Sequence, residues 1–404
     1  MEPPFFAYVA GCVLLYALIS RPLRRISLTA AIFFFFAGLP AGSFGLGLLE
    51  SESMHGAYLL AEITLALVLF VDATHASPAH IVRPHGAPLR LLLLGLPLVV
   101  VAGTAIAMLF LPGLSVWEAA VLAAIVAPTD AALGQPILED ERVPGDIRHV
   151  LNVESGLNDG LSVPILLILL CVARSDAHPD MAGYWIGFSA TQLILGPLTG
   201  AIVGYAGTKL LLRVARSREL EIQNRIGVAA VAILSYGLAE LVHGNGLIAC
   251  FIAGLVCGRV ARRPQLTSFA DAEGKLLAGL VFFVVGAQLL PAAWDDVNLS
   301  TLGFAIAALT IARMLPAGLT LIGTQMGWKA VVAIGWFGPR GVATIVFALL
   351  VDRLAEWDDR SIVFAAAMTT VALSIVLHGA TALPAVRWLT ANAGASRARA
   401  KVPR

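Results

Sequence analysis

The sequence has few charged residues: aspartate, glutamate, lysine and arginine make up 13% of its 404 residues. A soluble domain carries about 25% charged residues. Hydrophobic residues account for 58% of the chain, and the mean hydropathy is +0.85. This shortage of charge excludes a water-soluble globular protein and predicts an all-α polytopic membrane protein, with about thirteen transmembrane helices joined by short loops.

Other features that the sequence lacks exclude further classes. A formal net charge of +1 provides no basic surface for nucleic acid. The four cysteines lie in or near apolar runs without CxxC or metal-ligand spacing, so we expect neither a structural metal nor a cofactor. There is no HExxH motif, no GxSxG motif and no catalytic dyad, and the loops are too short for a substrate lid. We therefore expect no enzyme activity.

Hydropathy divides the chain into spans that end at charged residues or at Pro/Gly clusters. Their approximate extents are 5–20, 27–42, 56–75, 90–111, 117–134, 147–171, 184–212, 225–243, 245–260, 274–290, 301–323, 329–351 and 361–386. The first segment starts MEPPFF, without basic residues, so we interpret it as a span and not as a cleaved signal. The prediction is one transmembrane domain over residues 1–390 and a short basic cytoplasmic tail over 391–404.

Lysine and arginine alternate between the two ends of these spans. One set of ends and loops holds basic clusters at 21–25, 209–225, 259–263 and 387–404. The opposite set holds only Arg174, Arg353 and Arg360, beside acidic stretches at 48–56 and 292–300. Because cytoplasmic loops carry the excess of basic residues, the amino terminus is predicted outside and the carboxyl terminus inside.

Residues 127–164 carry acids where a bilayer helix should have none. The polar side chains there include Thr129, Asp130, Glu154, Ser155, Asn158 and Asp159. On a helix, Ser155 and Asp159 share one face, and Glu154 and Asn158 share the adjacent one. A charged side chain at membrane depth costs several kcal/mol unless it faces protein, water or a counter-ion. We interpret this stretch as an ion site.

Three basic residues within the predicted spans, Lys275, Arg313 and Arg340, belong to neither set of ends and loops. Arg313 and Arg340 lie deep, where arginine pairs with an acid or with helix-end carbonyls. Lys275 is nearer the predicted cytoplasmic end, where its amine is expected to reach the surface. Isolated polar residues of spans, Ser374 and His378 among them, are expected to serve helix packing.

Two spans are interrupted by proline and glycine. The fifth is broken at Pro128 and Gly134, and the twelfth at residues 338–341. Broken spans seven apart run in opposite directions, as inverted repeats with crossed, discontinuous helices require. Their half-helix ends are expected to present backbone dipoles to an ion near the midplane.

Seven short elements support a family resemblance. In chain order they are LFVDATH, APTD, ESGLND, VFFVVGAQL, ARMLP, GPRG and VLHGATALP. Together they resemble the NhaP-like sodium/proton exchangers, which are monovalent cation:proton antiporters of cation/proton antiporter type 1. The resemblance covers essentially the whole chain. It implies a homodimer in the cell (inner) membrane that works by alternating access, one bundle moving against a dimerisation scaffold.

The resemblance also implies roles for the ion-site residues. Asp159 would be the principal carrier of cation and proton, and Asp130 would lie beside it. Thr129 and Ser155 would contribute oxygen atoms, and Asp72 would be a further acid near the site. Na⁺ would therefore bind at Asp130 and Asp159.

Further residues would support the site. By resemblance, Glu154 forms a buried ion pair with Arg313, and that pair fixes Asn158. Arg340 resembles the arginine at the break of the twelfth span. Asn158 precedes Asp159 where electrogenic relatives have two adjacent aspartates, which implies electroneutral exchange of one cation for one proton.

The chemistry agrees with that expectation. Carboxylate, hydroxyl and carbonyl oxygens are the donors that hard cations such as Na⁺ and Li⁺ require. Neighbouring acids cannot all stay ionised, so a proton and a cation compete for the same group. A passive channel is disfavoured, because buried acid–arginine pairs and paired broken spans indicate a carrier. The choice between Na⁺ and K⁺ stays open, so K⁺/H⁺ exchange on the same scaffold is the alternative.

Overall fold

The computed structural model describes residues 3–25, 28–49, 54–75, 86–177, 181–214, 221–261, 268–355 and 357–391, and its regular elements there are all helical. Of the predicted tail over 391–404, only residue 391 lies in these ranges. The basic pair at 262–263 and the acids at 50–52 also lie outside the described residues.

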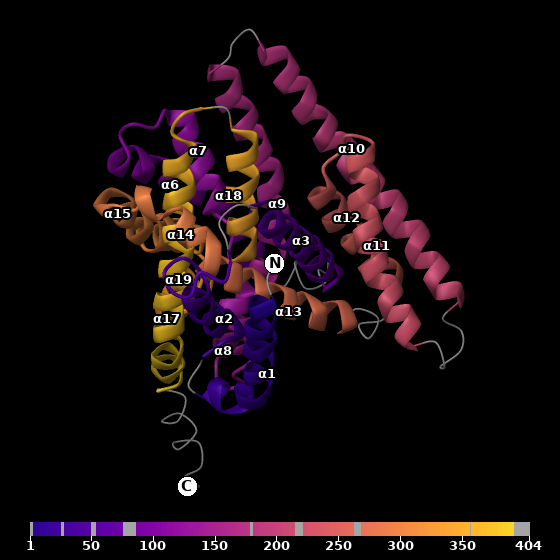
Figure 1. Cartoon of the computed structure of the whole chain (residues 1–404), viewed down its shortest axis with the longest axis horizontal. Helices are drawn as coiled ribbons and strands as arrows, with labels where there is room; N and C mark the ends of the chain where they lie inside the picture. Colours follow the sequence, from indigo (N-terminus) through magenta and orange to yellow (C-terminus); the bar gives the residue numbers. More distant parts are fainter. Residues whose placement is uncertain are drawn as a thin grey trace.

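The helices follow the predicted spans in order (Figure 1). The first half contains α1 (Pro3–Arg25), α2 (Ala30–Gly38), α3 (Met54–His75), α5 (Ala87–Arg90), α6 (Leu96–Phe110), α7 (Val116–Ile125), α8 (Ala131–Leu138) and α9 (Gly145–Ala177). The second half contains α10 (Ala182–Val214), α11 (Glu221–Leu241), α12 (Gly246–Ala261), α13 (Ser268–Val284), α14 (Leu290–Ala292), α15 (Leu299–Leu309), α16 (Ile311–Thr320), α17 (Trp328–Trp336), α18 (Val342–Leu354) and α19 (Arg360–Thr390). Short 3₁₀ turns follow α2 and α14, and π-helical turns precede α6 and follow α13.

Membrane-spanning character follows from length and composition. Within the described ranges, eight helices are long and apolar enough to cross a bilayer, and four shorter apolar helices accompany them. A soluble protein of this size would bury these apolar faces. Here large apolar side chains remain exposed along α10, as expected for a surface that faces lipid.

Local sequence explains how several helices begin. Ser115 and Glu118 form a capping box before α7: the Glu118 amide donates to Ser115 Oγ at 3.3 Å, and the Ser115 amide donates to Glu118 Oε2 at 2.7 Å. Asn298 and Thr301 do the same at the start of α15. These contacts satisfy backbone donors that a helix start leaves without partners.

Two helix pairs are separated by five non-helical residues in mid-path, whereas α15 and α16 are separated by Thr310 alone. The break between α7 and α8 covers 126–130, and the break between α17 and α18 covers 337–341. The prediction of a second interruption at Gly134 was wrong, because Gly134 lies inside α8. Membrane helices tolerate glycine, whereas Pro128 has no N–H to continue a helix.

The helices form two groups around a central region (Figure 1). On one side, α10 packs against α11 and α12, and α12 packs against α3. On the other side, α19 packs against α15 and α18. A Cβ atom added to Gly254 or Gly258 of α12 would lie 2.3 Å from the carbonyl oxygen of Phe70 or Thr74 on α3. Because these two glycines have no side chain, α3 can lie close to α12 on either side of Asp72.

Candidate functional site

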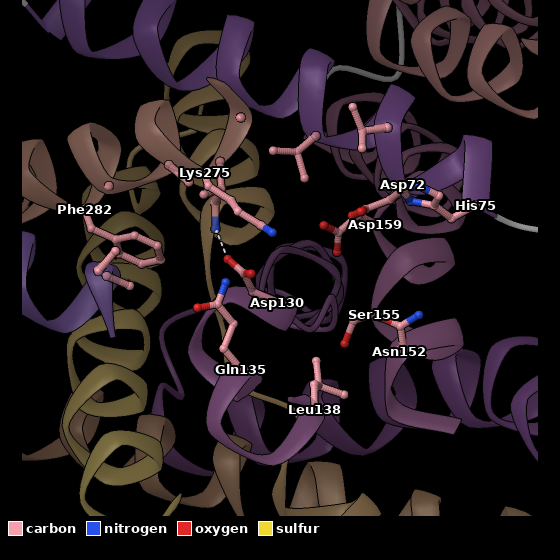
Figure 2. Close-up of a pocket in the computed structure, with 18 of the residues that line it drawn as sticks. Asp72, His75, Asp130, Gln135, Leu138, Asn152, Ser155, Asp159, Lys275 and Phe282 are labelled. Carbon is pink, nitrogen blue, oxygen red and sulfur yellow. Dashed lines mark hydrogen bonds between the residues drawn. The ribbon is translucent and has the colours of Figure 1, made fainter. Parts of the chain in front are cut away.

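A cavity of about 380 Å³ lies among α2, α3, α8, α9, α13 and the start of α18. Four of the predicted site residues line it: Asp72, Asp130, Ser155 and Asp159. Figure 2 shows their side chains facing one space, with Asp72 and Asp159 close together and Asp130 opposite. The three acids come from α3, from the first break and from α9, so folding brings together carboxylates that are 29 to 87 residues apart in the sequence.

Asp130 ends the first break and is held by the second. Its backbone N–H donates to the carbonyl oxygen of Pro339 at 2.7 Å, and its Oδ2 accepts from the N–H of Val342 at 3.1 Å. Val342 is the first residue of α18, so the carboxylate lies at the positive end of that helix. A Cβ atom on Gly341 would lie 1.7 Å from Asp130 Oδ2. Only glycine at position 341 leaves room for this contact.

Arg340 links the same two breaks in the other direction. Its side chain is fully buried, and its Nη1 donates to the carbonyl oxygens of Ala127 and, at 2.9 Å, of Pro128. These carbonyls follow the carboxyl end of α7, where a cation is favourable. The structure therefore gives Arg340 helix-end carbonyls as its hydrogen-bond partners.

Helix α9 has two polar faces, as its spacing predicts. Ser155 and Asp159 face the cavity, whereas Glu154 points away and binds Arg313 of α16. The ion pair is bidentate, with N–O distances of 2.5 and 2.8 Å, and both side chains are buried. Arg313 Nη2 also donates to the carbonyl oxygen of Ile334 on α17 at 3.2 Å. The pair thus joins α9 to the segment that precedes the second break.

Asn158 and Thr129 differ from their predicted contacts. Asn158 donates its amide to Thr129 Oγ1 at 2.6 Å, and the prediction that the Glu154–Arg313 pair fixes it was wrong. Thr129 is buried and does not line the cavity; its hydroxyl lies 3.3 Å from Ser155 Oγ. The Asn158 amide, the Thr129 hydroxyl and the Ser155 hydroxyl therefore form one chain of polar contacts. This chain exists because α9 turns Asn158 toward the first break.

Several cavity residues were not predicted as part of the site. Gln135, Asn152 and His75 line it, and Lys275, predicted to reach the surface, extends into it from α13 (Figure 2). The spacing along the helix could have identified two of them. Asn152 precedes Ser155 by three residues, and His75 follows Asp72 by three, so each shares a helix face with a predicted residue.

Comparison with known proteins finds matches that extend over nearly the whole chain. Residues 11–388 match the family model for the transmembrane sodium/hydrogen exchanger. The K(+)/H(+) antiporter NhaP of Alkalimonas amylolytica is 28% identical over 94% of this chain and 66% of its own length. The Na(+)/H(+) antiporter 2 of Zygosaccharomyces rouxii is 28% identical over 60% of this chain and 32% of its own. The chain thus spans just under two thirds, or less, of these relatives' lengths.

The fold is also similar to a solved structure. The sodium proton antiporter MjNhaP1 from Methanocaldococcus jannaschii, at pH 8, aligns with a TM-score of 0.76 at 19% identity, covering 96% of this chain and 98% of that one. A family model that matches from residue 11 to 388 is sufficient to assign the family. The chain belongs to the sodium/hydrogen exchanger family of membrane cation/proton antiporters, which are secondary transporters and not enzymes.

Proposed function

We propose that this protein exchanges Na⁺ or Li⁺ for H⁺, one for one, by alternating access, with cation and proton competing for Asp159 and Asp130. The observation that carries the proposal is the meeting of three carboxylates in one cavity at the contact between two helix breaks. The donors that face this cavity are carboxylate, hydroxyl and amide oxygens, which suit a hard monovalent cation.

Competition follows from the crowding of acids. Carboxylates that face one another across this cavity cannot all be ionised when it holds no cation, so one takes a proton or a cation. An empty, charged Asp159 would carry an uncompensated charge into the barrier, which is costly. The loaded states, protonated or cation-bound, therefore cross, and exchange results without a separate gate.

The cavity's position supports an inward-facing state. It is lined by the last two turns of α3, the end of α8 and residues in the amino-terminal halves of α9 and α13. With the amino terminus outside, these are all cytoplasmic ends. We extend the proposal to thirteen spans in two inverted repeats, with the broken helix pairs α7/α8 and α17/α18 crossing, and to a homodimer in the cell inner membrane with the carboxyl terminus inside.

Asn158 supports electroneutral exchange. The residue before Asp159 is a neutral amide, which donates a hydrogen bond to Thr129. A carboxylate at this position would add one negative charge to the site in every crossing. With one carrier acid, a bound proton and a bound cation leave the same net charge. The exchange would then be insensitive to membrane voltage.

K⁺/H⁺ exchange is the second candidate. The relative that matches over 94% of this chain is named a K(+)/H(+) antiporter, whereas the sodium name belongs to the similar solved structure and to a relative with shorter coverage. Pocket chemistry does not separate the two ions, since both take oxygen donors.

Proteoliposomes with a proton-gradient dye test the proposal. We expect Na⁺ and Li⁺ to dissipate the gradient equally with and without a valinomycin voltage clamp, and Asp159→Asn to abolish the response. Because protons compete for the same site, a tenfold rise in proton concentration should raise the apparent KM for Na⁺ by up to about tenfold. A response to K⁺ alone would assign the second candidate, and voltage dependence would refute the stoichiometry.

A further inference from the structure

Two buried residues of α19 contact both ends of the second break. Ser374 Oγ accepts a hydrogen bond from the backbone N–H of Arg340 at 2.7 Å, just before α18 begins. His378 Nε2 lies 2.9 Å from the carbonyl oxygen of Trp336, the last residue of α17. Neither Ser374 nor His378 has exposed surface. One turn of α19 therefore spans the interruption.

The imidazole ring of His378 makes the contact with the carboxyl end of α17. A carbonyl oxygen can only accept, so the tautomer with the proton on Nε2 donates a hydrogen bond to the Trp336 carbonyl oxygen, and its Nδ1 accepts from the Ser374 hydroxyl. Nδ1 lies 3.0 Å from Ser374 Oγ and 2.9 Å from the carbonyl oxygen of Ser374. The ring also packs against the Trp336 indole, with centroids 5.3 Å apart. Position 378 thus holds a group that bonds to α17 on one edge and to its own helix on the other.

The segment held in this way is the one that contacts the ion site. Between Trp336 and Val342 lie the Pro339 carbonyl that accepts from the Asp130 N–H, the Arg340 side chain and the glycine that Asp130 Oδ2 touches. The Phe337 N–H still donates to the Ala333 carbonyl oxygen at 2.8 Å as in a helix, but no N–H of residues 338–341 donates to the residue four before it, so contacts from other elements must define the path of these four residues. The contacts from α19 are placed at both ends of that path.

We propose that Ser374 and His378 are positioning residues of the ion site: by clasping both ends of the second break, they fix the position of Asp130 and so set the affinity for the transported cation. The effect on cation affinity rests on the proposed function. The structural claim, that Ser374 and His378 hold the second break in place, does not, and it is measured without transport.

The first readout is hydrogen exchange of peptides covering 337–342, measured by mass spectrometry on the full chain in nanodiscs. Loss of a buried hydrogen bond in Ser374→Ala should speed exchange of the Arg340 amide by up to about tenfold. His378→Leu should do the same, whereas His378→Gln, which keeps a donor for the Trp336 carbonyl, should remain closer to wild type.

The matched control is Thr370→Val. Thr370 lies on the same helix and is equally buried, and among the described residues its hydroxyl bonds to the Ala366 carbonyl within α19, at 2.7 Å, and to no other group. Hydrogen exchange over 337–342 in the Thr370→Val variant should equal that of the wild type. Unchanged exchange in both Ser374→Ala and His378→Leu, or an equal change in the control, would overturn the clasp.

The second readout is the split between KM and Vmax in the dye assay. Displacement of Asp130 should raise the apparent KM for the cation at least about threefold in Ser374→Ala and His378→Leu, with partial rescue in His378→Gln. Faster exchange with an unchanged KM would refute the positioning role. If the wild type transports neither Na⁺ nor K⁺, the proposed function fails while the exchange readout still tests the clasp.

Discussion

At the scale of single residues, the Glu154–Arg313 pair is the strongest polar contact near the site. Its bidentate geometry and complete burial make removal of one partner costly, because the other charge then has no counter-ion. The pair faces away from the cavity, so we assign it to architecture and not to ion binding. It ties α9, which carries Asp159, to α16 and to the end of α17.

A stability measurement checks this assignment. Glu154→Gln should lower the free energy of unfolding by about 3–5 kcal/mol, because it leaves Arg313 buried without an acid. The double variant Glu154→Leu with Arg313→Met replaces both charges by apolar groups and should recover most of that loss. Thermal and denaturant unfolding in detergent would measure it. A double variant as unstable as the single one would contradict a simple ion-pair role.

At the scale of elements, the start of α18 acts as an anion site for a residue of another helix pair. The N–H of Val342 donates to the Asp130 carboxylate, which lies at the positive end of that helix. Asp130 is therefore a carboxylate whose charge is stabilised by the second break, whereas Asp159 Oδ1 is buried without a hydrogen-bond partner among the described residues. This difference suits Asp159 to exchange its ligand.

Replacing one backbone donor tests this arrangement. Val342→Pro removes the N–H while proline remains favourable at the first position of a helix. A lost hydrogen bond to a charged group, worth about 1.5–3 kcal/mol, should leave the Asp130 carboxylate less firmly held and raise the apparent KM for the cation at least about tenfold. Val342→Ala, which keeps the N–H, is the comparison in the same transport assay. Equal KM values in the two variants would show that the donor contributes nothing.

At the scale of the whole molecule, the cavity and the basic residues lie at the same end of the predicted topology. The exposed Asn152 lines the cavity near the start of α9, and Leu241 is exposed at the end of α11, which the topology places on the opposite face. An inward-facing antiporter should therefore admit a polar reagent to the cavity from the cytoplasm only.

Cysteine labelling measures that sidedness. With the four native cysteines replaced, Asn152→Cys should react with an impermeant maleimide in inverted membrane vesicles and not in intact cells. Leu241→Cys should show the reverse pattern and serves as the control. Labelling of position 152 from outside only would overturn the predicted orientation.

The sequence by itself determined the helical class, the order of the spans, both breaks and the presence of acids within the spans, three of which line the cavity. These features are local: hydropathy depends on consecutive residues, a missing N–H at Pro128 interrupts its own helix, and the spacing of Ser155 and Asp159 defines a face. The excess of basic residues at one set of ends likewise needed only a count.

Only the tertiary structure decided which polar groups meet. Asn158 bonds to Thr129 and not to the ion pair, Lys275 enters the cavity, and His378 reaches the carbonyl of Trp336. Each partner lies on a different element of the fold, and its position depends on how the helices pack, which no local pattern encodes. A side chain's type is written in the sequence, whereas its partner is set by the distance and rotation between helices.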